Sequence, residues 1–283
     1  MKNQNKSNYT ITTTDKALIT ISKNADINDP EQVKQFIANL NVSNGYKKIL
    51  CTAYDKYADY YQIPWQMPRY QPEAKHRRIP TTQNINLLIA KARRKLSTQL
   101  TLSKETGLRP IELMNLKMKD IDLEHRKVYP TTAKNGAPRT LKIGKNLQAM
   151  LTNHINIKAL NLNDKLFTGT AENYSANYRQ MRNNLANKIG KPTLKTIRLY
   201  DFRHYFATML YAKTRDIIYV KQQMGHIKIE TTLRYVQLLE QADDEQEYYV
   251  KTATTIKEAT SLLENGFTYI QDIDGIKIYR KRK

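Results

Sequence analysis

Four prolines fall within residues 64–80 and divide the chain into two parts. Proline lacks a backbone N–H donor and fixes its own φ angle, so this run, PWQMPRYQPEAKHRRIP, cannot continue a helix or a central strand. A chain of 283 residues is long enough for two domains with cores of their own. We therefore predict an N-terminal domain over residues 1–66, a basic linker over 67–80 and a second domain over 81–283.

Helical patterns dominate the N-terminal part. The segment TTDKALITISKNA predicts only a weak helix, because threonine has a low helix propensity. The next segment, NDPEQVKQFIANL, is stronger, since Asp29 can cap a helix that starts at Pro30. Its apolar residues recur on one face: Val33, Phe36, Ile37 and Leu40. A further helix is expected in GYKKILCTAYDKYADYY, which makes this part a small helical domain.

The second part is mainly helical with little sheet. Two helical patterns, TTQNINLLIAKA and KLSTQLTLSKET, are followed by a period of two in HRKVYPTTAKNGAPRTLKI, which predicts two short strands around Asn135-Gly136. Helices resume from about residue 145 to about 246. From about 247 a strand, a helix and a hairpin at Asp274-Gly275 predict a small α/β appendage. The fold class is therefore mainly α with a small β-sheet.

The charge of the chain points to a polyanionic partner. Lys and Arg number 47 against 26 Asp and Glu, which gives a net charge of +21 and an isoelectric point near 9.8. The excess is spread along the chain and is not confined to a tail. Nucleic acid is the partner that such a balance favours.

Neither a membrane segment nor a metal site is expected. No apolar run reaches the length of about 18 residues that a membrane helix needs, and the first residues lack the apolar core of a signal peptide. We therefore expect a cytoplasmic protein. Cys51 is the single cysteine, so it has no internal disulfide partner, and no Cys or His lies beside it at zinc-ligand spacing. We expect it to be a small core residue, and we expect no cofactor.

The segment TGLRPIEL, residues 106–113, places an arginine at a fixed corner. Gly107 can end one helix and Pro110 can begin the next, while the residue before a proline is driven towards an extended backbone. Arg109 would then lie near the free amides of a helix start, which favour an anion. Taken alone, the segment is better explained as a surface arginine in a helix–helix turn.

A second arginine lies in TIRLYDFRHYFATML, residues 196–210. If Asp201 caps the helix, Arg203 falls in its first turn at the border of the apolar stripe, neither fully in the core nor free in water. A guanidinium there can hold a phosphate by two charge-assisted hydrogen bonds. The apolar stripe itself is Phe202, Phe206, Met209 and Leu210.

The third segment, QQMGHIKIETTLRYVQL, joins a histidine to a tyrosine. Gly225 can end one helix, His226 follows in the tight connection, and Tyr235 comes nine residues later in a helical pattern. A histidine in a turn is often only a cap, so this segment alone is weak.

Together these segments, with Lys134 at the hairpin tip, closely resemble the tyrosine recombinases, or phage-type integrases. The resemblance covers about residues 80–240; the part before the linker is similar to the family's core-binding domain, and ENGFTYIQDIDGIKIYRKRK is similar to the ending of archaeal members. It implies a helical core-binding domain and a mixed α/β catalytic domain that form a C-shaped clamp around double-stranded DNA. It also implies a metal-independent, nucleoid-associated enzyme, monomeric when free and tetrameric in synapse, that recombines specific sites through a 3′-phosphotyrosyl intermediate and a Holliday junction.

The resemblance implies a role for each site residue. Tyr235 would be the nucleophile, with Arg109 and Arg203 neutralising the non-bridging phosphate oxygens. Lys134 would protonate the leaving 5′ oxygen, and His226 would bond a phosphate oxygen or assist proton transfer. Supporting roles fall to Glu112, which would orient an arginine, and His204.

One position departs from the family's His-x-x-Arg motif. Its first member here is Tyr200, whose phenol can donate a hydrogen bond to phosphate but is a poor base at neutral pH. The group that deprotonates Tyr235 therefore stays open between His226, Tyr200 and water. Lys134 is preferred as the acid over Arg139 and Lys142, because it precedes the turn.

Two other functions stay open. A type IB topoisomerase would use the same chemistry to relax DNA without pairing two sites. A DNA-binding protein that has lost catalysis would keep only the basic surface, and Tyr200 leaves room for that reading.

Overall fold

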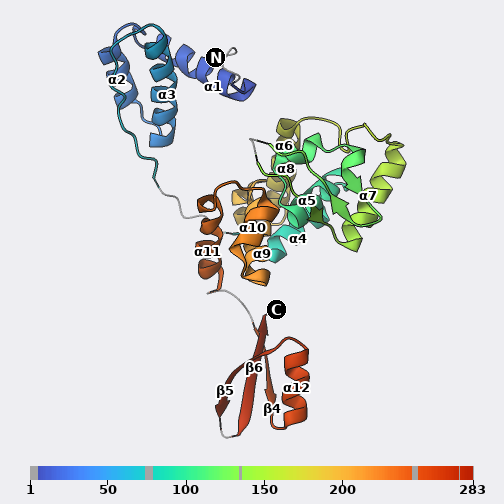
Figure 1. Cartoon of the computed structure of the whole chain (residues 1–283). Helices are drawn as coiled ribbons and strands as arrows, with labels where there is room; N and C mark the ends of the chain where they lie inside the picture. Colours follow the sequence, from blue (N-terminus) through green and yellow to red (C-terminus); the bar gives the residue numbers. More distant parts are fainter. Residues whose placement is uncertain (1–5, 74–78, 134–135, 244–247, 274, 283) are drawn as a thin grey trace. The chain divides into compact units, whose positions relative to one another are not determined.

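The computed structural model describes residues 6–73, 79–133, 136–243, 248–273 and 275–282. The chain divides into two compact units, Met1–His76 and Arg77–Lys283. Helices make up most of both, as predicted, and Figure 1 shows their order along the chain.

The described residues of the first unit form three helices, α1 (Asn8–Ser22), α2 (Pro30–Asn39) and α3 (Asn44–Tyr60). Asp29 caps α2 as predicted, since its Oδ1 accepts the N–H groups of Glu31 and Gln32. The core of this unit is buried aliphatic and aromatic surface from all three helices: Ile21, Val33, Ile37, Leu50, Cys51 and Tyr54. Cys51 is thus the small core residue that the sequence predicts.

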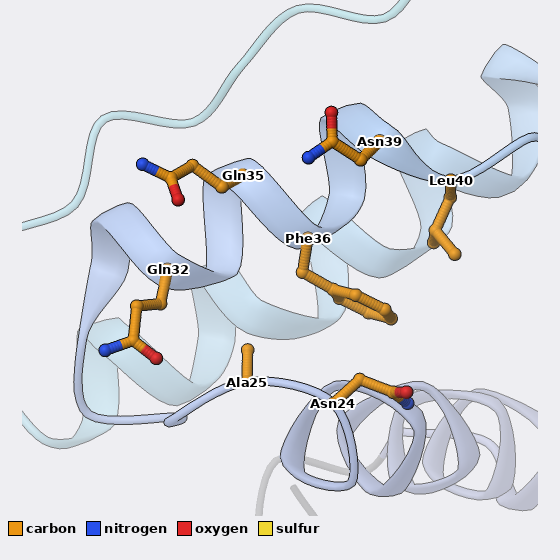
Figure 2. Close-up of a pocket in the computed structure, with 7 residues that line it drawn as sticks. All are labelled: Asn24, Ala25, Gln32, Gln35, Phe36, Asn39 and Leu40. Atoms are coloured by element: carbon orange, nitrogen blue, oxygen red, sulfur yellow. The ribbon is translucent and has the colours of Figure 1, made fainter.

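A shallow pocket of about 370 Å³ lies beside α2 in this unit. Phe36 and Leu40 are only half-buried because they line it, together with amide side chains from α2 and from the turn that follows α1 (Figure 2). The predicted apolar face of α2 is therefore covered at Val33 and Ile37 and open at its border.

The second unit is built around one central helix. α5 (Arg94–Thr106) is buried at every residue from 98 to 103, and it contacts most of the other helices of this unit. Gly107 ends α5 in the left-handed conformation, with φ +60°, as predicted. The other helices, in chain order, are α4 (Thr82–Lys91), α6 (Pro110–Asn115), α7 (Lys145–Lys158), α8 (Ala171–Lys188), α9 (Asp201–Thr214), α10 (Ile217–Met224) and α11 (Glu230–Asp243), with short 3-10 turns η2 (Met118–Asp120) and η3 (Pro192–Thr196).

A small antiparallel sheet follows α6. Its strands, β1 (Ile121–Asp122), β2 (Lys127–Val128) and β3 (Leu141–Lys142), are in the order β1-β2-β3. Val128 pairs with both Ile121 and Leu141, and these apolar residues face the main core. The strands on either side of Asn135-Gly136 were predicted, although they are shorter than the pattern suggested; β1 was not predicted.

The C-terminal segment has the predicted order of strand, helix and hairpin. β4 (Tyr248–Ala253), β5 (Thr268–Ile273) and β6 (Ile276–Arg282) form an antiparallel sheet in the order β4-β6-β5. α12 (Ile256–Glu264) begins with a capping box between Thr255 and Glu258 and packs on a small core of Ala253, Ala259 and Tyr279. Of the predicted turn, Gly275 has φ +78° and Asp274 lies outside the described residues.

Among the described residues, no helix is both long enough and apolar enough to cross a lipid bilayer.

Candidate active site

The corner between α5 and α6 holds Arg109 as the sequence predicts. Its backbone is extended, with φ −66° and ψ 147°, directly before Pro110. A side chain at position 107 would collide with the ring of Phe206, so the turn requires glycine for space as well as for its φ angle. At this corner α5 packs against α9, and Arg109 lies near enough to Arg203 for their charges to interact.

The carboxylate of Glu112 holds several parts of the site together. Its carboxylate accepts hydrogen bonds from Nη1 of Arg109 and Nη2 of Arg139, each at 2.7 Å, and from the backbone N–H groups of Arg109 and Ala133 at 2.9 and 3.3 Å. Burial alone would raise the pKa of Glu112, but the hydrogen bond and charge of Arg139 and those of Arg109 outweigh it and lower this pKa to about 2. Glu112 is therefore ionised and does orient an arginine, in fact two.

Arg203 lies deeper than predicted. The expected position at the border of an apolar stripe is wrong, since the residue is only 1% exposed. Its Nη1 donates to the carbonyl oxygen of Gly107 at 2.5 Å and its Nη2 to that of Met224 at 2.6 Å. These carbonyls lie at the C-terminal ends of α5 and α10, where the helix dipole favours a cation.

Burial and the charge of Arg109 lower the pKa of Arg203 to about 10, which leaves it charged at neutral pH. Its depth was not visible in the sequence because both carbonyl partners come from other helices.

The start of α9 also differs from the prediction. Tyr200 occupies the position before the helix, and Asp201 is the first helical residue, so the expected cap at Asp201 is wrong. Asp201 instead accepts the backbone N–H of Arg198 at 2.7 Å, which tightens the turn ahead of the helix. Of the expected stripe, Phe202 is fully buried, whereas Phe206, Met209 and Leu210 are half-buried.

His226 links Arg203 to the start of α11. Gly225 ends α10 with φ +62°, as predicted, and the imidazole that follows has its Nε2 at 3.1 Å from Nη2 of Arg203. Its Nδ1 lies 3.0 Å from Oγ1 of Thr232. Burial and the charges of Arg203, Arg109, Arg234 and Arg139 lower the pKa of His226 to about 3, so the ring is neutral at physiological pH.

Tyr235 is enclosed by α9, α10 and α11. It is 2% exposed and packs with Ala207, Val220, Met224 and Leu238. Its ring stacks on that of His226, with centroids 6.4 Å apart and planes 9° from parallel. Its hydroxyl lies 3.3 Å from Nδ1 of His204.

Tyr200 lies at the outer edge of this group. Its side chain is 42% exposed, and its ring meets that of His204 edge-on at 5.2 Å. Lys134 lies outside the described residues. Two described residues near it in the chain contact the site: Ala133 donates to Glu112, and Ala137 donates to the carbonyl of Gly225 at 3.4 Å.

The structure thus gathers most of the residues that the sequence singled out. They are Arg109, Glu112, Arg203, His204, His226 and Tyr235. Two members of the site were not assigned their places: Arg139, which was weighed only as a rival to Lys134, and Thr232, for which the sequence offered no signal. Lys142, the other rival, is exposed on β3.

Chemically, the site combines fixed cations with a neutral imidazole and a phenol. Arg109, Arg139 and Arg203 surround one carboxylate, so positive charge remains for an anionic ligand such as a phosphodiester. Among the described side chains, the phenol of Tyr235 is the candidate nucleophile whose ring lies parallel to that of neutral His226, which in turn contacts Arg203.

Comparisons with known proteins agree with this geometry. The phage integrase family model matches residues 78–242. Tyrosine recombinase XerA of Saccharolobus solfataricus is 28% identical over 192 residues, which cover 67% of this chain and 62% of that protein. The chain therefore spans less than two thirds of the length of this relative.

Two solved structures share the fold. A crystal structure of XerA recombinase aligns with a TM-score of 0.51 and 22% identity, covering 87% of this chain and 92% of that one. The integrase of transposon Tn1549, solved in complex with transposon right end DNA, aligns with a TM-score of 0.67 and 16% identity, covering 85% and 94%.

Proposed function

The chain belongs to the phage integrase family, and from this premise we propose that it is a site-specific DNA recombinase. Its substrate is double-stranded DNA, which it cuts and rejoins through a covalent 3′-phosphotyrosyl intermediate. The net charge of +21 supports a polyanionic substrate. The XerA relative is named a tyrosine recombinase, which supports the same assignment.

One observation carries the proposal. The Tyr235 ring stacks on His226, whose Nε2 lies 3.1 Å from Arg203, which in turn lies 4.0 Å from the carboxylate that holds Arg109. A nucleophile, a neutral imidazole and two arginines thus form one continuous group. These are the parts that phosphoryl transfer without a metal ion needs.

The chemistry assigns each residue a task. Tyr235 attacks the scissile phosphorus and forms a phosphate ester, while Arg109 and Arg203 neutralise the charge that grows on the non-bridging oxygens. Lys134, which follows Ala133 in the sequence, protonates the 5′ oxygen that leaves; the backbone N–H of Ala133 donates to Glu112. The ester keeps the energy of the broken bond, so rejoining needs no nucleotide cofactor.

Assembly follows from the same proposal. Recombination exchanges strands between two duplexes, so we propose that copies of the chain pair two DNA sites as a tetramer and pass through a Holliday junction. The free chain is proposed to be a monomer. The first unit, Met1–His76, is proposed to contribute to DNA binding.

Covalent trapping tests the function. The substrate is a pool of nicked duplexes with random sequence. When the enzyme cleaves near the nick, the short strand between the cleavage point and the nick dissociates. The enzyme then has no 5′ hydroxyl with which to rejoin the DNA, and it remains covalently attached. The wild-type chain should yield covalent complexes whose sequenced ends share one site, and Tyr235→Phe should yield none. Binding of duplex DNA without any adduct from the wild type would support a binding protein instead.

A further inference from the structure

The proton of Tyr235 has an imidazole nitrogen as its neighbour. Nδ1 of His204 lies 3.3 Å from the Tyr235 hydroxyl, and the two ring centroids are 5.8 Å apart. His204 comes from the first turn of α9 and Tyr235 from α11, two helices that pack against each other. Both side chains are buried. Cleavage requires the phenol to lose this proton as it attacks, so the identity of the acceptor decides how the nucleophile is activated.

His226 is poorly suited to accept that proton. Its Nε2 faces Nη2 of Arg203 at 3.1 Å, and its Nδ1 faces the hydroxyl of Thr232 at 3.0 Å. Both nitrogens are thus engaged with groups other than the nucleophile. The pKa of about 3 that burial and the arginines impose means that this ring does not hold an added proton at neutral pH.

Tyr200 is also poorly suited. A neutral phenol is a hydrogen-bond donor and only a very weak base. Its ring meets that of His204 edge-on, with centroids 5.2 Å and planes 70° apart, so it packs against the imidazole.

We propose that His204 accepts the proton of Tyr235 during strand cleavage, an inference that rests on the proposed recombinase function. As Oη of Tyr235 bonds to phosphorus, its proton passes to Nδ1 of His204. The bond from phosphorus to the 5′ oxygen breaks, and that oxygen takes a proton from Lys134. Rejoining runs in reverse, with the 5′ hydroxyl attacking and His204 returning its proton to the tyrosine.

The geometry sets two conditions for this role. Nδ1 must carry the lone pair, so neutral His204 holds its own proton on Nε2. The 3.3 Å separation is at the long end of a hydrogen bond, and catalytic hydrogen bonds commonly shorten when the substrate binds.

The experiment separates proton transfer from packing. His204→Asn keeps a hydrogen-bonding group near the place of Nδ1 but offers no basic nitrogen. Single-turnover adduct formation on a nicked duplex that carries the trapped site should slow by about 100-fold or more, the usual contribution of a general base. Placing 3,5-difluorotyrosine at position 235 of this variant should restore most of the rate, because that phenol is more acidic and ionises with less help.

Two controls accompany the variant. The wild-type chain with 3,5-difluorotyrosine at position 235 should change little, since its base is present. His154→Asn removes another buried histidine, which lies outside the site and whose Nε2 is 2.8 Å from the carbonyl oxygen of Leu166. This variant should cleave at the wild-type rate under conditions where it is folded.

The outcomes are distinct. A His204→Asn rate equal to that of the wild type overturns the inference, and so does a slow variant that the fluorinated tyrosine does not restore, because that result makes His204 a packing residue. The absence of any adduct from the wild-type chain overturns the recombinase function itself.

Discussion

The carboxylate of Glu112 and the guanidinium of Arg139 lie 2.7 Å apart, and both side chains are almost completely buried. The two residues are 27 positions apart, so their ion pair ties the start of α6 to the returning arm of the loop before β3. The same carboxylate holds Arg109 and the backbone of Ala133. One buried ion pair therefore sets the position of an arginine and of the loop that precedes Lys134.

Arg139→Leu should destabilise the fold and slow cleavage. Removing one partner of a buried ion pair typically costs about 3–5 kcal/mol, because the other charge stays buried. The remaining Arg109 offsets part of this cost. Urea unfolding monitored by circular dichroism measures the change, and adduct formation measures the effect on the site.

A matched control is available in an exposed pair. Arg198 lies 3.6 Å from Asp201 and its side chain is 68% exposed. Arg198→Leu should therefore change the free energy of unfolding by less than about 1 kcal/mol. Equal losses for the two variants would contradict the special place of Arg139.

Arg203→Lys should separate catalysis from DNA binding. A lysine keeps the charge but cannot donate to Gly107, Met224 and His226 from one planar group. We expect adduct formation to fall by about 100-fold or more, the usual effect of losing a donor to a developing oxyanion. Duplex affinity should stay within about threefold, because one phosphate contact is a small part of a broad basic surface. Gel shifts and trapping on the same duplex test this, and a parallel loss of both would show that Arg203 serves binding.

The stability of the fold should fall as the pH drops from 6.5 towards 5. The pKa of His226 in the folded chain is about 3, below its ordinary value of 6.5, so only the unfolded chain binds this proton over that range. The contribution of His226 to the free energy of unfolding is complete above about pH 6.5. It declines as the pH falls towards 3, by at most about 1.4 kcal/mol per pH unit. The lowered pKa of Glu112 matters only below about pH 4.5, so the two effects separate.

His226→Gln tests that slope. Glutamine can still accept from Arg203 but does not titrate, so the melting temperature of this variant should fall less between pH 6.5 and 5 than that of the wild type. If the two curves run parallel, the titrating group is another residue.

Plasmid assays should distinguish recombination from relaxation. A supercoiled plasmid with two copies of the trapped site should give deletion or inversion products, whereas a plasmid without the site should stay supercoiled. Efficient relaxation of both plasmids without recombinants would identify a type IB topoisomerase activity.

Local signals in the sequence predicted the ends of elements well. Gly107 and Gly225 end their helices in the left-handed conformation, and Asp29 caps α2, because each depends on residues within one turn of the chain. The order of helices and strands followed from periodicity for the same reason.

Long-range packing decided what the sequence did not reveal. Arg203 was expected at a border, yet its carbonyl partners lie 96 and 21 positions away and draw it into the interior. The place of Arg139 could not be assigned, because its partner Glu112 lies on α6, 27 positions earlier in the chain. The role of Thr232 depends on the turn that follows Gly225, which sets the histidine ring against the start of α11.

The single carboxylate of Glu112 also sets the net charge of the site. Three guanidinium groups, of Arg109, Arg139 and Arg203, meet this one anion, while His226 stays neutral, so three positive charges less one negative leave two positive charges in the described cluster. A phosphodiester carries one negative charge before attack, and a second develops on its non-bridging oxygens as the bond to Tyr235 forms. The two excess positive charges of the guanidinium groups therefore match the charge on the phosphate of DNA when its backbone is midway between intact and cut, while the proton of Tyr235 passes to His204.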